Sequence, residues 1–341
     1  MKINIKGIPK KELEEKIVSL GGKKYNAVQI MQWLYKRNIY NFSEMTNLSK
    51  NLKEMLNEHC CVNELKIVSK KISSIDKTTK YLLECEDKEK IECVLLFHSA
   101  RNTLCVSSQV GCKFGCIFCA TGLSGFKRNL TCAEILDQLI LVQRDSKVQI
   151  NNIVFMGMGE PLENYTETLN AISILMAPEA FNIGPRKITI STVGFVPGIE
   201  KLIKEKIPLN LSVSLHSVDD IIRSELMPVN NKYPLGKLLP LVKTYPKITG
   251  GKLTFEYTLI DKVNDSFKEI KKLASLTGDI KCKVNLIPFN CVSGVEYKKV
   301  KIEQVEKWKK VLENNKITVT VRHEKGSDIC AACGQLRALN L

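Results

Sequence analysis

The chain has 341 residues, of which 44% are apolar and 26% charged, and its formal net charge is +15. This apolar fraction supports a packed core and excludes wholesale disorder, and no apolar run approaches the roughly 20 residues needed to span a bilayer. The basic excess favours a polyanionic partner, because attraction to phosphates is the commonest use of such a field. The first six residues alternate polar with apolar side chains and lack a signal peptide's apolar stretch, so we expect a cytoplasmic protein.

Three segments near the N-terminus have apolar residues at helical spacing, namely 10–20, 26–37 and 47–59. Residues 1–80 contain 16 Lys and Arg against 8 Asp and Glu, so over half of the net positive charge lies in less than a quarter of the chain. We therefore interpret residues 1–64 as a small basic helical accessory domain that binds the polyanion. A charged surface that only keeps the protein in solution is the alternative.

The rest of the chain contains mostly alternating strands and helices. Residues 65–101 alternate apolar and polar side chains, which predicts a β-ribbon that links the accessory domain to a core over 102–325. In that core a strand, a loop and a helix recur six times, which favours a parallel sheet with right-handed crossovers. An open six-stranded barrel and a doubly wound sheet both fit. The strands are expected at 103–108, 152–156, 187–191, 210–215, 253–259 and 282–287, the helices near 131–143, 165–176, 198–205, 235–243, 266–276 and 303–314, and a last strand at 316–323 precedes a tail, 326–341.

Polar residues and glycines follow most of these strands directly. Gly157-Met158-Gly159-Glu160 comes after the second strand, Ser191 ends the third, Ser214-Leu215-His216 the fourth, and Asn290 follows the sixth. The carboxyl ends of parallel strands meet at one edge, where α/β folds build their active sites. The sequence therefore predicts a site at this edge.

The loop after the first strand of the core carries three cysteines, Cys112, Cys116 and Cys119, spaced C-x3-C-x2-C. Three thiolates in eight residues can hold three irons of one cluster and leave the fourth iron without a protein ligand. Four-cysteine sites are closed and carry electrons, whereas an open position can bind a substrate or cofactor. Zinc completed by a distant residue is the alternative, as are unrelated buried cysteines. Chain-wide, the thirteen cysteines are too few for a disulfide-stapled secreted scaffold of this length.

The cysteine motif, with Phe118 before its last cysteine, resembles the radical S-adenosylmethionine (SAM) superfamily, whose fold is a partial (βα)6 barrel. Seven ordered motifs narrow the resemblance to the RlmN/Cfr family of RNA adenine methyltransferases, over nearly the whole chain: SSQVGCKFGCIFCATG, MGMGEPLENY, ISTVGFVPG, SLHS, RSELMPVN, VNLIPFN and AACGQL. The resemblance implies a partial (βα)6 radical SAM barrel with the N-terminal helical domain as its RNA-binding accessory.

This resemblance also implies the cofactors and their ligands. One [4Fe–4S] cluster would be held by the three cysteines of the loop, and SAM would bind its open iron, with two SAM used per turnover. Glu160 would accept hydrogen bonds from the SAM amino group, and Gly159 would allow close approach of the backbone. The remaining SAM contacts would be Ser191, Ser214, Leu215, His216 and Asn290.

The same resemblance assigns three catalytic residues. Cys333 would be S-methylated by one SAM, and a radical made from the second SAM would take a hydrogen from that methyl group so that its carbon can add to C2 of adenine. Cys105 would then form a disulfide with Cys333 to release the product, while Glu92 removes the C2 proton, a task suited to a buried carboxylate with a raised pKa. The implied substrates are 23S rRNA at the peptidyl transferase centre and the tRNA anticodon loop.

Several alternatives remain at this stage. Cfr-type methylation at C8 of the same ribosomal adenine, which confers antibiotic resistance, is one, and a non-catalytic iron–sulfur or zinc RNA-binding module is another. Cys330 forms a C-x-x-C pair with Cys333, where the family more usually has a residue without a thiol. We interpret Cys330 as incidental, although a local disulfide would sequester the methyl-carrying sulfur. An electron donor such as flavodoxin and a monomeric state complete the expectations, and no membrane partner is expected.

Overall fold

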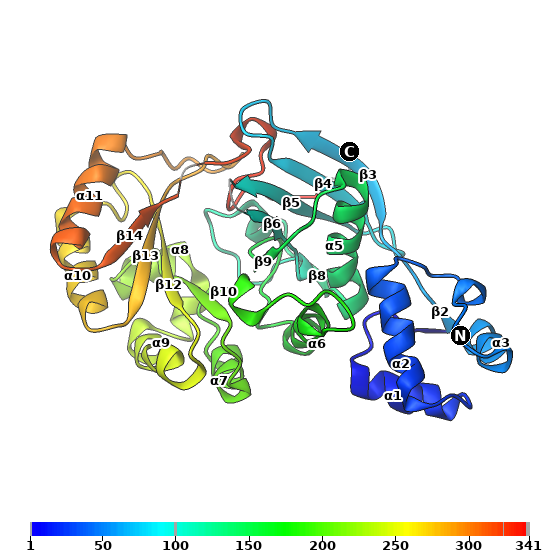
Figure 1. Cartoon of the computed structure of the whole chain (residues 1–341). Coiled ribbons are helices and arrows are strands. Elements are labelled where there is room, and N and C mark those ends of the chain that lie inside the picture. The colour runs from blue at the N-terminus through cyan, green and yellow to red at the C-terminus, as the bar shows by residue number, and fades with distance from the viewer. Residues whose placement is uncertain (1, 99–100, 323, 339–341) are drawn as a thin grey trace.

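The N-terminal region folds as helices packed around its apolar side chains, as the spacing predicts. The computed structural model describes residues 2–98, 101–322 and 324–338. It contains α1 (Lys10–Ser19), α2 (Lys24–Met31) continued by a π-helical turn (Gln32–Lys36), and α3 (Lys50–His59), whose first turn is capped by the Ser49 hydroxyl. Strand β1 (Ile3–Asn4) pairs in parallel with β2 (Cys60–Cys61) and ties the two ends of the region together. Figure 1 shows this region beside the core rather than within it.

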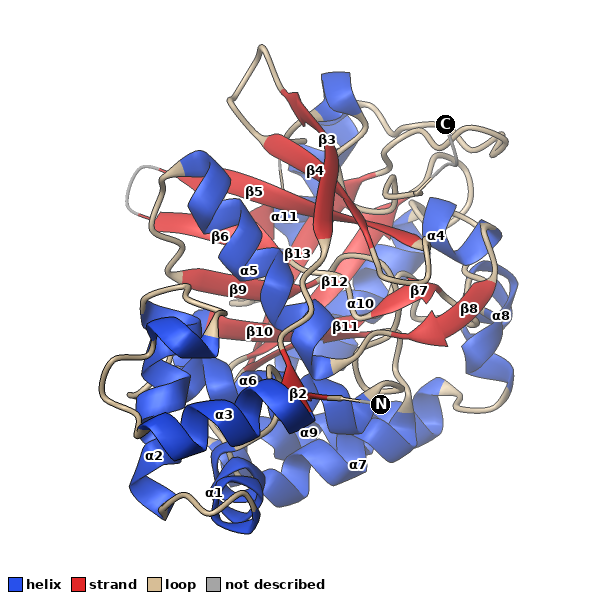
Figure 2. Ribbon diagram, turned by 90° about the vertical axis from the view of Figure 1, so that its right-hand side faces the viewer, coloured by secondary structure: helices blue, strands red, loops and turns tan. Residues whose placement is uncertain are grey.

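The core is one ten-stranded sheet with helices on its outer face (Figure 2). Seven parallel strands run in the order β14-β13-β12-β11-β10-β9-β6. They are β6 (Arg101–Cys105), β9 (Asn152–Phe155), β10 (Ile188–Thr192), β11 (Asn210–Ser214), β12 (Leu253–Leu259), β13 (Cys282–Pro288) and β14 (Thr318–Val321). The principal helices between them are α5 (Cys132–Ser146), α6 (Tyr165–Met176), α7 (Val196–Glu205), α8 (Asp220–Leu226), α9 (Leu235–Thr249), α10 (Phe267–Gly278) and α11 (Ile302–Asn314). Six strand–helix units and a last strand thus form the partial barrel.

The two faces of each barrel strand differ in polarity, and this difference positions the site. In β10, Ile188 and Ile190 are fully buried, whereas Thr189 and Ser191 alternate with them and are partly exposed. Successive side chains of a strand point to opposite faces, so the isoleucines pack beneath the helices and the hydroxyls face the barrel interior. The interior is therefore polar.

The β-ribbon predicted over 65–101 forms, and its strands also extend the barrel sheet. They are β3 (Lys66–Ile72), β4 (Thr79–Glu84) and β5 (Lys90–His98), and β5 pairs antiparallel with β6. Alternation in the sequence predicts strands, but it does not show which strands pair. In the structure β3 pairs with β4, β4 with β5, and β5 with the first strand of the barrel. A short hairpin of β7 (Gln109–Gly111) and β8 (Phe126–Asn129), which flanks the cysteine loop and the short helix α4 (Ala120–Leu123), escaped the sequence analysis.

Two other predicted elements differ at their ends. The helix expected at 235–243 continues to Thr249 through Pro240 and Pro246. The last strand covers Thr318–Val321 instead of 316–323; His323, like residues 339–341 of the predicted tail, lies outside the described residues. None of the helices in the described part of the chain is both long and apolar enough to cross a membrane.

A buried ion pair joins the N-terminal region to the core. The Lys6 Nζ lies 2.5 Å from an Asp137 carboxylate oxygen, and both side chains are at most 2% exposed. The other Asp137 oxygen accepts a hydrogen bond from the Leu65 backbone N–H at 2.9 Å. Beside them, Gly7 at φ +88° packs so tightly on Ala133 that a Cβ would lie 2.6 Å from its backbone nitrogen. The region is docked on α5 by specific buried contacts.

Candidate functional site

The cysteine loop lies at the carboxyl ends of the barrel strands and is held by backbone hydrogen bonds. The Cys112 N–H donates to Gly125 at 2.8 Å, and the Ile117 N–H donates to Leu226 at 3.1 Å. Burial raises the pKa of the Cys116 thiol well above its usual value, and the neighbouring thiols of Cys119 and Cys112 raise it further. The three thiols are therefore close enough to influence one another.

The donor set of this loop fits an iron–sulfur cluster with one open iron. No group of three His, Cys, Asp or Glu side chains within residues 2–98, 101–322 and 324–338 is arranged to hold a single metal ion. A four-iron cluster makes a different demand, because each thiolate binds its own iron. Three neighbouring thiols on one short loop, all reduced and mostly buried, meet that demand.

A cavity of about 160 Å³ adjoins the cysteine loop. Cys116 and Cys119 of that loop line it, together with residues at the strand ends, namely Gly159, Glu160, Ser191, Ser214, His216 and Asn290. Gly159 has φ +96°, and a Cβ there would lie 2.5 Å from that of Gln109, so only glycine leaves this corner undistorted. Six of the seven residues predicted to contact SAM therefore line this one cavity.

Leu215 is the exception among the predicted SAM contacts. Its side chain is fully buried in the hydrophobic core and does not line the cavity. Its N–H donates to the Glu256 carbonyl at 3.0 Å, and its own carbonyl accepts from the Arg223 Nε at 3.0 Å. Both backbone groups are engaged, so the structure gives no support to a contact at this position.

Glu160 is a buried carboxylate without a cationic partner in the described part of the chain. Its oxygens accept backbone hydrogen bonds from Val193 at 2.8 Å and Leu162 at 3.1 Å, which fix the orientation of the group. Burial raises the pKa of Glu160 to about 7. A carboxylate held in this way at a cavity wall is suited to an ammonium group of a ligand, because a cation would restore its charged form.

His216 and Asn290 supply neutral hydrogen-bonding groups to the same cavity. The His216 Nδ1 accepts from the Thr258 N–H at 2.9 Å, so its Nε2 carries the proton, and burial lowers the imidazole pKa to about 3. The Asn290 amide donates to the Cys333 carbonyl at 2.9 Å, while its buried Oδ1 has no hydrogen-bond partner among the described residues. An unpaired buried oxygen is costly, so this atom also fits a site completed by a ligand.

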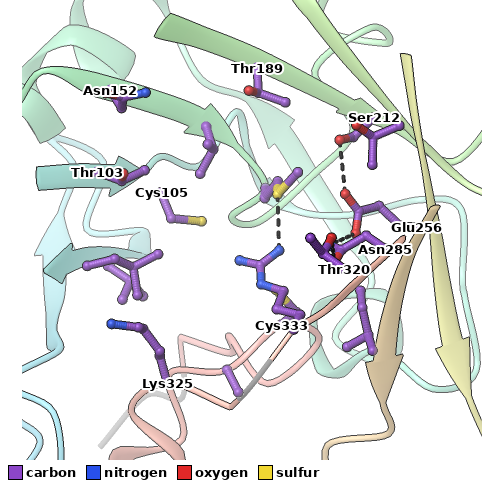
Figure 3. Close-up of a pocket in the computed structure, with 18 of the residues that line it drawn as sticks. Thr103, Cys105, Asn152, Thr189, Ser212, Glu256, Asn285, Thr320, Lys325 and Cys333 are labelled. Atoms are coloured by element: carbon purple, nitrogen blue, oxygen red, sulfur yellow. Dashed lines mark hydrogen bonds between the residues drawn. The ribbon is translucent and has the colours of Figure 1, made fainter. Parts of the chain in front are cut away.

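A second, larger cavity of about 680 Å³ occupies the barrel interior, and it contains Cys105 and Cys333 (Figure 3). Cys105 ends β6 and Cys333 lies on the C-terminal tail, where its thiol is close enough to raise the pKa of Cys105. Burial raises the pKa of Cys105 to about 12, while the Arg322 guanidinium lowers it. Cys333 also lines the smaller cavity, so the two cavities adjoin at this residue.

Glu92 is buried, but it lines neither cavity. One carboxylate oxygen lies 3.0 Å from the Lys80 Nζ, and the other accepts the Arg337 N–H at 2.9 Å. In this conformation the predicted base anchors the C-terminal tail and is covered by it.

The tail is held on several sides, and Cys330 faces outward. The Gly334 carbonyl accepts from the Ala120 N–H at 2.7 Å, and the Leu336 carbonyl accepts from the Thr121 hydroxyl at 2.6 Å, which places the tail against the cluster loop. Cys330 is exposed, its thiol is free, and it lines neither cavity. Cys333 and Cys330 therefore lie in different surroundings despite their spacing.

The sequence analysis missed two groups of residues that the cavities bring together. Arg322 lines both cavities and donates to the Met156 sulfur at 3.6 Å. The short polar side chains of the barrel interior form the second group. In the sequence these side chains were visible as Ser, Thr and Asn residues that alternate with apolar residues in the strands. They are Thr103, Asn152, Thr189, Ser212, Asn285 and Thr320 (Figure 3).

Comparisons with known proteins agree with this geometry. A family model described as the ribosomal RNA large subunit methyltransferase N-terminal domain, RlmN_N, matches residues 3–62, and the radical SAM superfamily model matches residues 106–274. The chain is 45% identical to a probable dual-specificity RNA methyltransferase RlmN of Pseudothermotoga lettingae over 99% of this chain and 98% of that protein. It is 46% identical to the protein of the same name from Alkaliphilus oremlandii, over 100% and 99% of the two chains. The crystal structure of a radical SAM methyltransferase from Sphaerobacter thermophilus superposes with a TM-score of 0.92 at 40% identity, covering 99% and 100% of the two chains.

Proposed function

The chain belongs to the RlmN family of radical SAM RNA methyltransferases, and we propose that it methylates C2 of an adenine in 23S rRNA, at the peptidyl transferase centre, and in the tRNA anticodon loop. Aromatic C2 of adenine is neither acidic nor nucleophilic, so an ordinary polar methyl transfer fails there. A carbon radical can add to it. The protein must therefore position the reacting groups and exclude water.

Cys112, Cys116 and Cys119 are the proposed ligands of one [4Fe–4S] cluster, and Glu160 and Asn290 the principal SAM contacts. When bound, the cluster and two SAM molecules per turnover supply a methyl group and, after one-electron reduction, the radical that abstracts hydrogen. We assign that electron to a donor such as flavodoxin and take the monomer as the active form. His216 remains neutral throughout the physiological range, so it contributes a hydrogen bond without charge.

Cys333 is the proposed methyl carrier, and the observation that carries this proposal is its position at the junction of the two cavities. Among the described cysteines, Cys333 alone lines both, so its sulfur can accept a methyl group on the SAM side and present it to a base in the barrel. Cys105 is proposed to attack the Cys333 sulfur. Its thiolate would form the S–S bond as the S–C bond breaks, and the leaving carbon would take up a proton to become the methyl group of the product. The unpaired electron left on the adduct by radical addition would return to the cluster as the C2 proton is removed.

Glu92 is proposed as the base that takes the C2 proton, and this role requires the tail to move. Its two oxygens are engaged by Lys80 and by the backbone of Arg337. Loss of the Arg337 hydrogen bond would uncover the carboxylate, while the contact with Lys80 would hold it in place. Product release and tail movement are therefore expected to be coupled.

Anaerobic reconstitution with iron, sulfide, SAM and a chemical reductant tests the proposal, with an unmodified tRNA transcript as substrate. We expect 5′-deoxyadenosine and RNA methylated at C2 by mass spectrometry. Cys333→Ala should abolish methylation and retain the cluster absorbance, whereas Cys330→Ala, three residues away on the same tail, should methylate normally. Methylation by the Cys333 variant would refute the carrier role.

The same experiment separates the alternatives. A methyl group at C8 instead of C2 would assign the chain to the Cfr type. Absence of 5′-deoxyadenosine from the cluster-loaded wild-type protein would favour a non-catalytic RNA-binding module.

A further inference from the structure

The larger cavity has a second end that the SAM site does not use. Its lining extends from Cys105, at the carboxyl end of β6, back to Arg101, where that strand begins. Strands rise by about 3.3 Å per residue, so the cavity follows about 13 Å of strand. It therefore reaches the amino ends of the barrel strands, opposite the cluster loop.

Basic side chains from four barrel segments surround this amino-terminal end. They are Arg101 at the start of β6, Arg186 before β10, Lys252 before β12 and Lys283 at the start of β13, here called the basic mouth. Within the described residues, none of the four forms an ion pair. Their charges are concentrated on one rim and face solvent without compensation.

The carboxylates that line the same cavity do not neutralise the basic mouth. Glu256 lies deeper in the barrel, where it accepts hydrogen bonds from Ser212 at 3.0 Å and Asn285 at 2.7 Å. Glu324 is paired with Lys299 at 2.6 Å. The mouth is therefore a positive ring around an open passage, which attracts and orients a polyanion.

The passage itself has room and polar groups for a base. Closed barrels fill their interior with layers of bulky branched side chains. Here short side chains such as Thr103, Thr189 and Ser212 point into the interior, which stays open at about 680 Å³ (Figure 3). A nucleotide that is flipped out of the base stack can place its base inside this cavity, while the phosphates on either side of it remain at the protein surface.

The accessory domain adjoins the same end of the barrel. Its Tyr35 ring packs on Phe181 with centroids 5.3 Å apart, and Lys10 pairs with Glu179 at 2.8 Å. Phe181 and Glu179 belong to the segment between α6 and β10 that leads into Arg186. The accessory domain therefore packs against the segment that leads into the mouth.

We propose that the substrate RNA enters through the basic mouth, with the target adenine threaded along the barrel to Cys105 and Cys333 and its flanking phosphates bound by Arg101, Arg186, Lys252 and Lys283. This inference rests on the proposed function and specifies its direction of entry. The RNA and SAM then approach Cys333 from opposite ends of the barrel, so neither blocks the other.

The test compares Arg186→Gln/Lys252→Gln with Lys237→Gln/Lys268→Gln, each in the full-length, cluster-loaded protein. Lys237 and Lys268 are exposed, line neither cavity, and lie in the first turns of α9 and α10, at the opposite end of the barrel. Both variants lose the same net charge. Deleting the accessory domain would be a poorer test, because Lys6 and Gly7 pack into the core.

Binding of a short single-stranded oligoribonucleotide is measured as a function of salt. Loss of two phosphate contacts should reduce the slope of log K against log salt by about 1.4 and weaken binding roughly 10- to 30-fold at 0.1 M salt, with no such change in the control. Equal slopes for the wild type and the mouth variant, or equal losses in both variants, would overturn the proposed entry.

Two further readouts separate this inference from the proposed function. Formation of 5′-deoxyadenosine and methylation of Cys333, measured without RNA and with a chemical reductant, should be unchanged in the mouth variant. If the wild-type protein itself fails to methylate RNA, the proposed function fails instead. If the mouth variant binds RNA normally and is slow only with a flavodoxin as reductant, the mouth is a docking surface for an acidic electron donor and RNA entry is refuted.

Discussion

Replacement of Lys6 by Met should destabilise the protein in a pH-dependent way. Lys6 is the only ammonium group within ion-pair distance of Asp137 among the described residues, and both side chains are buried. Removing one partner of a buried ion pair costs about 3–5 kcal/mol, because the other charge is left without compensation. We therefore expect a loss of about this size at pH 8, measured by guanidinium unfolding followed by far-ultraviolet circular dichroism.

The pH dependence follows from the carboxyl group of Asp137. Burial raises its pKa from 3.8 to about 6 even with Lys6 present, and Lys6 opposes that shift. A pKa raised on folding contributes stability below the unfolded value that is lost as the pH rises through the folded value. Without Lys6 the pKa of Asp137 in the folded protein rises further. The free energy of unfolding of the variant therefore keeps falling above pH 6, whereas Asp137 no longer lowers that of the wild type there. The penalty should grow by about 1.4 kcal/mol per pH unit there.

Lys6→Met/Asp137→Asn is the matched control. The amide retains an acceptor for the Leu65 N–H and does not titrate, so the pH dependence of the penalty above pH 6 should disappear. A penalty for Lys6→Met that is the same at pH 6 and pH 8, or below about 1 kcal/mol at both, would refute the reasoning.

Three further substitutions test the site. Gly159→Ala should lower the free energy of unfolding by roughly 1–3 kcal/mol, seen as a lower Tm, because φ is +96° and the new Cβ would lie 2.5 Å from Gln109; an unchanged Tm would contradict the tight approach. Glu160→Gln should weaken SAM binding about 10- to 100-fold in equilibrium titration of the reconstituted protein, since a charge-assisted hydrogen bond contributes about 1.5–3 kcal/mol, and the cluster absorbance should remain; unaltered affinity would exclude Glu160 from the SAM contacts. Cys105→Ala should leave RNA attached covalently to Cys333, detected as a shifted band on a denaturing gel; normal turnover would exclude the disulfide step.

Periodicity and motif spacing were sufficient for the local features of this protein. The strand over 253–259 and the helix over 165–176 have the predicted ends, because their alternating and helical apolar patterns are local properties of the chain. The cysteine loop was equally predictable, since its three cysteines lie within a span of eight residues. The convergence of Glu160 and Asn290 followed from topology, because parallel strands bring their carboxyl ends to one edge.

Features that depend on distant partners were not predictable in this way. Residues 65–101 were expected to form a β-ribbon. That this ribbon is part of the barrel sheet depends on β6, which pairs with β5 on one side and with the much later β9 on the other. Leu215 was expected at the SAM site, yet its side chain belongs to the core. Glu92 was expected to face the substrate, yet the tail that covers it comes from more than two hundred residues further along the chain.

The sequence by itself determined the chemistry of this protein, because the cysteine spacing, the polar strand ends and the basic charge are written in consecutive or regularly spaced residues. Only the tertiary structure decided where that chemistry can act. It brought Cys333 to the junction of two cavities, left the barrel interior open, and collected four separated basic residues into one mouth. Each of these depends on side chains far apart in sequence meeting in space, which local patterns do not encode.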